Sequence, residues 1–193
     1  MSKLFNPERK DRLDRPERAA WQKPDDVVAT LGLEPGMAVA DIGAGTGYFA
    51  FRIAPLVGAS GMVYAVDLQQ EMLDTVQERA EEQGVKSITF VKSGPVATTL
   101  PDDTVDLVFL SSITHEYDDI DEGIAECARI TKPGGRIAVV DWAYRETEVG
   151  PPLDHRLDPE KLIAAIKKAG FRSSDPIPLL DHHYFYIFSR AGA

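Results

Sequence analysis

The segment Ala38-Val39-Ala40-Asp41-Ile42-Gly43-Ala44-Gly45-Thr46-Gly47-Tyr48-Phe49 decides how this chain folds. It opens as an apolar run behind Pro35-Gly36, a turn signal, so residues 37–42 are predicted to form a buried strand. Three glycines follow within five positions, and then come apolar residues with helical spacing (Phe49, Ile53, Leu56 and Val57). A strand, a glycine-rich turn and a helix form the first half of a βαβ unit, whose helix start directs free N–H groups at a ligand.

The spacing of these glycines limits the ligand. A dinucleotide fingerprint needs G-x-G-x-x-G, and the last position of that spacing is Tyr48 here. A P-loop is excluded because no G-K-S/T follows. Asp41 stands just ahead of the first glycine, where a carboxylate would repel a pyrophosphate and suit a ligand with an ammonium group. The alternative is a purely structural glycine turn in another α/β protein.

The run D-x-G-x-G-x-G resembles motif I of the class I S-adenosylmethionine (SAM)-dependent methyltransferases. The resemblance implies SAM as the cofactor and S-adenosylhomocysteine (SAH) as the product. It also implies that the turn binds the methionine part of the cofactor. The cofactor contacts implied within this motif are Asp41, Gly43, Ala44, Gly45, Thr46, Gly47 and Tyr48.

Asp67 extends the same site. It ends a predicted strand over residues 62–66 and lies twenty residues after Gly47, a spacing at which an acid meets ribose hydroxyls. Dinucleotide and SAM sites both use such an acid, and an ordinary strand-end aspartate is the alternative. In the family an acid often follows the third strand, predicted here over 87–91, but this chain has Lys92-Ser93-Gly94-Pro95 instead. The adenine contact is therefore absent or supplied by Ser93 and backbone groups, and the predicted contacts on this side are Leu68, Met72, Ser93 and Gly94.

Two further stretches carry the resemblance. Residues 100–110 resemble the family's L-P-D/N-x-S/T-F/V-D-x-V/I entry to the fourth strand, and residues 131–137 resemble L-K-P-G-G-x-L/I before the fifth. The loop Ser111–Tyr117 follows the fourth strand and should lie in the crevice at the carboxyl ends of the strands, so Ser111 joins the cofactor contacts. Within the class, the chain looks like the ubiquinone/menaquinone-type and related small stand-alone methyltransferases.

The catalytic candidates are polar residues near that crevice. Methyl transfer from a sulfonium is a one-step displacement that depends mainly on positioning, and a base helps only if the acceptor loses a proton. His115 is the first choice because its ordinary pKa is about 6.5. A histidine that only braces a carboxylate is the alternative. The other candidates are Glu116, Asp141 and His155; no tight ligand spacing among them supports a metal site, and no metal is expected.

The alternation of strands and helices predicts an α/β fold, a doubly wound three-layer sheet with helices on both faces. Residues 175–180 and 183–189 are predicted to form a hairpin, giving one antiparallel strand. The resemblance implies seven strands in the order 3-2-1-4-5-7-6. Residues 1–24 are predicted as an N-terminal arm with one or two short helices across the domain, or as a partly disordered leader, and residues 25–193 as the SAM-binding domain. The loop after Asp141-Trp142 should cover the site.

Several polar and aromatic residues are interpreted as structural. Asp119 and Glu122 fit a capping box, so Asp118 and Asp119 are predicted caps. Cys127 is at an apolar helical position and is predicted to be a buried, inert thiol. His182 and His183 are interpreted as structural, since two adjacent residues of a strand would point to opposite faces. The aromatic residues that follow should pack the core and the sheet: Tyr184, Phe185, Tyr186 and Phe188.

Composition narrows the class of protein. The 193 residues suit one domain, 44% are hydrophobic, and no apolar run approaches the ~20 residues of a membrane span. One cysteine and no signal-peptide h-region favour the cytoplasm. A net charge of −10 argues against nucleic acid as partner, and favours a small-molecule acceptor or a basic peptide. A monomer and a homodimer both stay open. The competing functions are a non-catalytic SAM/SAH-binding protein and an NAD(P)-dependent oxidoreductase.

Overall fold

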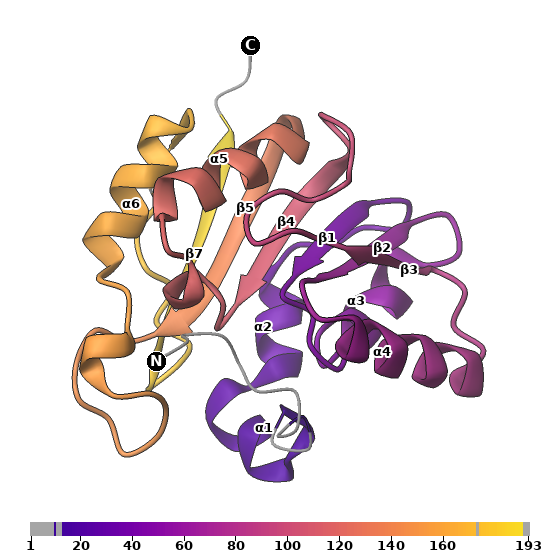
Figure 1. Cartoon of the computed structure of the whole chain (residues 1–193), viewed down its shortest axis with the longest axis horizontal. Helices are drawn as coiled ribbons and strands as arrows, with labels where there is room; N and C mark the ends of the chain where they lie inside the picture. Colours follow the sequence, from indigo (N-terminus) through magenta and orange to yellow (C-terminus); the bar gives the residue numbers. More distant parts are fainter. Residues whose placement is uncertain (1–9, 11–12, 173, 191–193) are drawn as a thin grey trace.

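The computed structural model describes residue 10, residues 13–172 and residues 174–190. Its strands are β1 Ala38–Ile42, β2 Met62–Asp67, β3 Ile88–Lys92, β4 Val105–Ser111, β5 Thr131–Trp142, β6 Phe171–Arg172 and β7 His183–Arg190. They form one seven-stranded sheet in the order β3-β2-β1-β4-β5-β7-β6 (Figure 1). Neighbouring strands are parallel except at β7, which runs antiparallel to both β5 and β6. The predicted fold class and strand order are confirmed.

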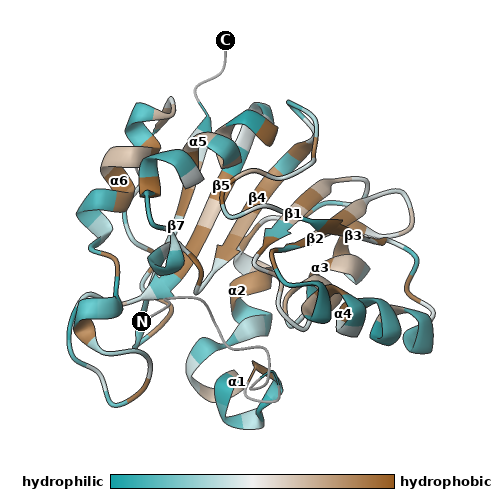
Figure 2. Cartoon of the chain, viewed as in Figure 1, coloured by the Kyte–Doolittle hydropathy of each residue, from teal (hydrophilic) through white to brown (hydrophobic). Residues whose placement is uncertain are grey.

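Helices cover both faces of this sheet (Figure 1). They are α1 Pro16–Gln22, α2 Pro24–Thr30, α3 Ala50–Val57, α4 Gln70–Gln83, α5 Ile120–Ile130 and α6 Pro159–Lys168, with short 3-10 turns η2 Thr114–Glu116 and η3 Leu153–His155. Side chains alternate across each strand, so Ala40 packs with α5 and α6 while Val39 packs with α2 and α3. The central strands consist mostly of hydrophobic residues, whereas helices such as α4 are largely hydrophilic along their length (Figure 2). No helix in the described residues is long and apolar enough to cross a membrane.

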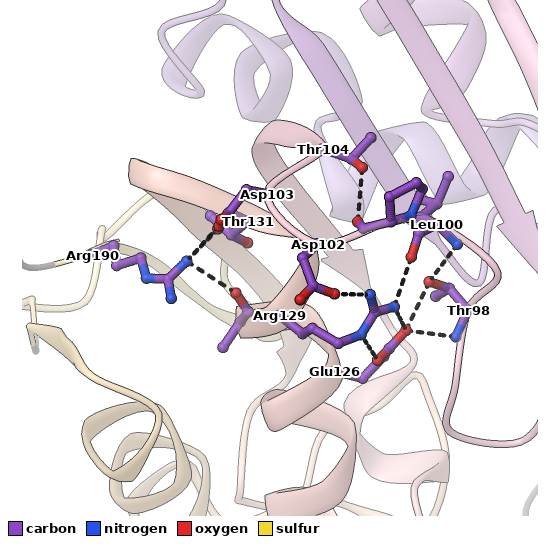
Figure 3. Close-up of polar contacts among 11 residues, drawn as sticks. Thr98, Leu100, Asp102, Asp103, Thr104, Glu126, Arg129, Thr131 and Arg190 are labelled. Atoms are coloured by element: carbon purple, nitrogen blue, oxygen red, sulfur yellow. Dashed lines mark hydrogen bonds and ion pairs between the residues drawn. The ribbon is translucent and has the colours of Figure 1, made fainter.

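Polar caps and one arginine network fix the segments around β4 and α5. Asp119 caps α5 by accepting the N–H groups of Asp121 and Glu122 at 2.8 and 3.4 Å, whereas Asp118 lies ahead of the cap. Arg129 at the end of α5 donates to Asp102 at 2.6 Å and to the Leu100 carbonyl at 2.8 Å (Figure 3). It also holds Glu126, which accepts the N–H and O–H of Thr98, both at 2.7 Å. The segment between β3 and β4 is thereby tied to α5.

The predicted C-terminal hairpin is wrong. Strand β6 is only Phe171–Arg172, directly after α6, and it pairs with the far end of β7, Phe171 opposite Arg190. Residues 175–180 contain no strand, although the Ile177 N–H donates to the Phe185 carbonyl at 2.8 Å. Pro176 and Pro178 explain this, because a proline has no N–H to give to a sheet ladder. The single antiparallel strand that the hairpin was meant to supply is nevertheless present as β7.

Other predictions about this half of the chain have mixed outcomes. Strand β5 begins at Thr131, so the motif that was expected to precede the fifth strand is already part of it, with a shift in pairing to β4 between Thr131 and Arg136. Strand β7 begins at His183, as predicted, and His182 lies in the segment before it. The buried thiol is confirmed: Cys127 is 2% exposed, and burial raises its pKa to about 12. The four predicted packing aromatics are also buried: Tyr184, Phe185, Tyr186 and Phe188.

Candidate functional site

A cavity of about 150 Å³ opens at the carboxyl ends of β1, β2 and β4. The strand order reverses between β1 and β4, and ligands of open α/β sheets bind outside such a switch point. Four segments of the sheet domain and two residues of the N-terminal arm form the wall. The lining residues are Leu13, Arg18, Ile42, Gly43, Ala44, Gly45, Asp67, Leu68, Gln69, Met72, Ser93, Gly94, Pro95, Val96, Thr98, Ser111, Ser112, Ile113, Glu116 and Tyr117.

The glycine turn after β1 forms one side of this wall. Gly43 and Gly45 have φ of +70° and +55°, a conformation that favours glycine. A Cβ at Gly43 would lie 2.8 Å from Ile113 Cγ1, and one at Gly45 would lie 3.0 Å from Leu13 Cδ1. The N–H groups of Gly43 and Ala44 donate to the Val66 carbonyl at 2.8 and 3.0 Å, which fixes the turn against β2. The turn therefore has no room for a side chain at Gly43 or Gly45, because Ile113 and Leu13 of the wall pack directly against it.

Asp67, the last residue of β2, stands beside that turn. Its carboxylate accepts the N–H of Gly45 and the N–H of Gln69, each at 2.9 Å. The side chain is largely buried, and burial raises the pKa of its carboxyl group. Each bond engages a different oxygen, so both oxygens retain a lone pair for a further donor. This is an acceptor arrangement that matches two neighbouring hydroxyl groups.

Asp41 is buried behind the wall and is 2% exposed. Its Oδ2 has no hydrogen-bond partner among the residues described, which is unusual for a buried carboxylate. Burial and the nearby Asp67 raise the pKa of Asp41 to about 7, against the influence of Arg18 and of a hydrogen bond from the Ala50 N–H. Three more predicted cofactor contacts also stay behind the lining: Thr46, Gly47 and Tyr48. The other nine lie in the wall: Gly43, Ala44, Gly45, Asp67, Leu68, Met72, Ser93, Gly94 and Ser111.

The predicted catalytic residues meet where η2 folds over the end of β5. His115 Nδ1 lies 2.7 Å from Asp141 Oδ1, and Asp141 is 1% exposed. Asp141 also accepts the Thr114 hydroxyl, the His115 N–H at 3.2 Å and the Trp142 N–H at 2.7 Å. Burial acts to raise the pKa of Asp141, but the His115 charge and these hydrogen bonds outweigh it and lower the pKa. Glu116 lines the cavity, whereas His115 and Asp141 stand just behind it.

The loop between β5 and α6 does not line the cavity, contrary to expectation, and His155 on η3 stays away from the wall. Arg156 holds this loop together and is 8% exposed. Its guanidinium donates to five loop acceptors, the carbonyls of Pro151, Ala143, Arg145 and Val149 and the hydroxyl of Thr147, at 2.7–3.2 Å. The loop is thus closed on itself, and no residue of it reaches the cavity.

The N-terminal arm takes the covering position instead. Gln22 on α1 is fully buried and donates to Ser111 Oγ at 3.0 Å (Figure 1 shows α1 beyond the edge where β4 ends). Trp21 stacks on His183 at 5.4 Å and lies 5.2 Å from Trp142, between ring centroids. Leu13 and Arg18 were missed as wall residues by the sequence reasoning. The available signal was the isolated apolar anchors Leu13 and Trp21 in an otherwise charged segment.

The comparisons with known proteins agree with this geometry. Residues 17–150 match the ubiE/COQ5 methyltransferase family. The chain belongs to that family. The predicted class is thereby confirmed: a class I, SAM-dependent methyltransferase, with SAM as the cofactor of that class. Within the described residues, no group of three or more histidine, cysteine, aspartate or glutamate side chains could hold a metal ion.

Relatives of known name cover part of the chain. The ubiquinone/menaquinone biosynthesis C-methyltransferase UbiE of Marinomonas sp. (strain MWYL1) is 31% identical over 130 residues, 67% of this chain and 51% of that protein. The demethylmenaquinone methyltransferase of Anoxybacillus flavithermus is 29% identical over 122 residues, 63% of this chain and 51% of that protein. The chain therefore spans about half the length of the curated relatives it matches.

Solved structures match more of it. A SAM-dependent methyltransferase from Aquifex aeolicus superposes with a TM-score of 0.92 at 29% identity, covering 97% of this chain and 100% of the other. The [4+2]-cyclase SpnF superposes with a TM-score of 0.78 at 19% identity, covering 91% and 82%. The second likeness shows the fold alone. A cyclase on this fold also illustrates that the reaction has to be argued from the site.

Proposed function

We propose that this protein transfers a methyl group from SAM to a small-molecule acceptor. The observation that carries the proposal is the wall of the cavity at the switch point, where the Gly45 N–H of the glycine turn donates to the Asp67 carboxylate. Family membership supports the same cofactor. The cofactor supplies an electrophilic methyl group on a sulfonium, and the protein has to bind it and orient the acceptor.

The residues present fit such a cofactor. Asp67 is positioned to accept the two ribose hydroxyls with the lone pairs that Gly45 and Gln69 leave free. The orphaned oxygen of Asp41 provides negative charge close to the turn, where the ammonium group of the methionine part would be stabilised. On the adenine side, the chain offers apolar and small residues instead of an acid: Leu68, Met72, Ser93 and Gly94.

His115 is our candidate for a base, if the acceptor loses a proton. With Nδ1–H donated to Asp141, the lone pair that accepts a proton is on Nε2. Asp141 would then be a positioning residue that fixes the ring and stabilises the imidazolium. Glu116 lines the cavity and is the candidate for orienting the acceptor.

The acceptor class follows from the relatives. Their names state methylation in ubiquinone and menaquinone biosynthesis, so we propose a quinone-related ring as the first acceptor to test. We also propose residues 1–24 as an arm over a domain of residues 25–193; residues 1–9, 11 and 12 of that arm lie outside the described residues. The cytoplasmic location and the choice between monomer and homodimer stay predictions from the sequence.

Parallel calorimetric titrations of the protein with SAM, SAH and NADH test the cofactor. We expect micromolar binding of SAM and SAH and none of NADH. Asp67→Ala should weaken SAM binding at least 10-fold because it removes the acceptor of two hydroxyl hydrogen bonds, each worth ~1 kcal/mol or more. Asp74→Ala, an exposed aspartate on α4, is the matched control and should bind normally. NADH binding without SAM binding would contradict the methyltransferase assignment and favour an oxidoreductase.

Turnover separates the enzyme from a non-catalytic SAM-binding protein. Labelled SAM is incubated with a panel of quinol acceptors, and labelled product is measured for the wild type and for His115→Gln. We expect transfer by the wild type and a loss of ~100-fold or more in the variant if the base is used. Tight SAM binding with no transfer to any member of the panel would favour the binding protein.

A further inference from the structure

Arg18 is a residue of the arm, yet its side chain lies in the wall of the cavity. Its guanidinium is held in a defined orientation: Nε donates to Gln22 Oε1 at 2.5 Å and Nη1 donates to the Leu13 carbonyl at 2.7 Å. The group also lies 4.1 Å above the ring centroid of Tyr48, the residue that follows the glycine motif. Gln22 in turn donates to Ser111 at the end of β4. The arm and the sheet thus position this cation together.

The charge of Arg18 is not balanced by an ion pair in the described part of the chain. Other arginines there do pair with carboxylates, for example Arg52 with Asp25 at 3.0 Å and Arg129 with Asp102 at 2.6 Å, but no such pair includes Arg18. Burial lowers the pKa of Arg18 to about 10, so it remains a cation at neutral pH. The Arg18 side chain is only partly exposed, and a cation in a cavity wall that has no paired carboxylate among the described residues favours an anionic ligand at this position.

Asp41 provides the opposite charge in the same region when it is ionised, above about pH 7. Each of the two groups shifts the pKa of the other, but they form no ion pair with one another in the described residues. Asp41 keeps an oxygen without a partner behind Ile42 and Gly43 of the wall, and Arg18 reaches the wall from the arm. An α-amino acid carries an ammonium and a carboxylate on one carbon atom. The two charges, neither of them ion-paired within the described residues, are complementary to such a group.

We propose that Arg18 binds the α-carboxylate of the amino-acid part of the cofactor, so that helix α1 forms part of the cofactor site. This inference rests on the proposed function. The guanidinium fork suits a carboxylate, because two parallel N–H groups meet two oxygens. The cofactor thereby contacts α1, and through Gln22 the contact continues to Ser111. Ligands that lack the carboxylate should lose this contact.

The test compares two ligands on three proteins by calorimetric titration. The ligands are SAH and decarboxylated SAH, which differ only in the carboxylate. The proteins are the wild type, Arg18→Met and Arg15→Met; Arg15 is exposed at the start of the same helix and makes no side-chain cap bond, so it is a control of equal charge change. We expect the wild type and Arg15→Met to bind SAH about 10- to 100-fold more tightly than the decarboxylated ligand.

For Arg18→Met, affinity for SAH should fall by that factor, and affinity for decarboxylated SAH should stay within about two-fold of the wild type. Equal binding of both ligands by the wild type, or an equal loss for both ligands in Arg18→Met, would overturn the inference. No binding of either ligand to the wild type would contradict the proposed function itself. Thermal unfolding checks the fold of each variant. If Arg18→Met does not fold, Arg18→Lys replaces it, since it keeps the charge and loses the fork.

Discussion

Two buried aspartates occupy equivalent places in this sheet, each one residue before the carboxyl end of its strand. Asp41 in β1 is 2% exposed and Asp141 in β5 is 1% exposed. Asp141 accepts from Thr114, from the His115 ring and backbone, and from the Trp142 N–H. Asp41 has an oxygen without a partner among the described residues. The pKa of Asp141 is lowered, whereas burial and Asp67 raise that of Asp41 to about 7.

The segments that follow the two strands explain the difference. After β4, the turn η2 folds over β5 and brings the donors of Thr114 and His115 to Asp141. After β1, the chain continues as a glycine-rich turn, and its two hydroxyl side chains, Thr46 and Tyr48, make no hydrogen bond to Asp41 or to any other described residue. A buried carboxylate supplied with donors by the protein is suited to positioning a neighbour, here His115. One that lacks donors is suited to receiving them from a ligand.

The largest expected effect is on stability, from Asp141→Asn. The amide removes the charge and presents an N–H₂ group to donors that need an acceptor, so the free energy of unfolding should fall by about 3–5 kcal/mol. Urea denaturation at pH 7.5 measures it. Asp41→Asn is the comparison variant and should be no less stable than the wild type, because it removes a buried charge without a full set of donors. Equal losses in both variants would contradict the distinction.

A pH series should show opposite behaviour of the two groups. The folded protein holds a proton on Asp41 up to about pH 7, while the unfolded chain releases it near pH 4. The folded state therefore binds more protons in this window, and stability falls as the pH rises from 4 to 7, by on the order of 2–4 kcal/mol. Asp141, with its lowered pKa, contributes stability that is lost only as the pH falls below about 4.

Denaturation of the wild type and Asp41→Asn at each pH isolates the Asp41 contribution. The raised pKa of Asp67 acts in the same direction but is present in both proteins. The free energy of unfolding of the wild type should be close to that of Asp41→Asn at pH 4 and lower than it at pH 8. A constant difference between the two curves from pH 4 to 8 would show that Asp41 does not titrate in this range.

SAM affinity should depend on Asp41 more than on Asp141, which is the reverse of the order expected for stability. Asp41→Asn is expected to weaken SAM binding about 10- to 100-fold, because the ammonium group loses its anion. Asp141→Asn, measured under conditions where it is folded, should change SAM affinity less than about three-fold, since its partners belong to the protein. Calorimetric titration of both variants checks this. A larger loss in Asp141→Asn than in Asp41→Asn would reverse the assigned roles.

Much of the fold could be predicted from the sequence, because its signals are local. The apolar run, the glycines after it and the acid at Asp67 each depend on a few neighbouring residues. The strand order came from resemblance and not from the residues. The C-terminal error had a physical cause: residues 175–180 have apolar side chains at strand-like positions, yet Pro176 and Pro178 lack the N–H groups that a ladder requires. The two prolines are themselves a sequence signal against a strand over residues 175–180.

The site was harder to predict because its remaining features come from long-range contacts. His115 and Asp141 were both candidates, but their 2.7 Å contact depends on how η2 folds over β5. Arg18 and Gln22 gave no local signal, since a charged arm resembles any solvated segment. Their position depends on Trp21 packing against Trp142 and His183, which are more than 100 residues away in sequence. Periodicity carries no information on such contacts.

The smallest expected effect concerns the Thr114 hydroxyl, one of the four hydrogen-bond donors to Asp141. Thr114→Val removes one hydroxyl donor at nearly constant volume, in a residue that is 1% exposed. Three donors to Asp141 remain, so stability should fall by only about 1–2 kcal/mol, and SAM affinity should not change. Thr114→Ser keeps the hydroxyl and should recover the hydrogen bond, leaving only the loss of a methyl group. Urea denaturation of the two variants measures the difference. If Thr114→Ser is as unstable as Thr114→Val, the hydroxyl contributes nothing to stability, and the lowered pKa of Asp141 depends on His115 and the backbone donors.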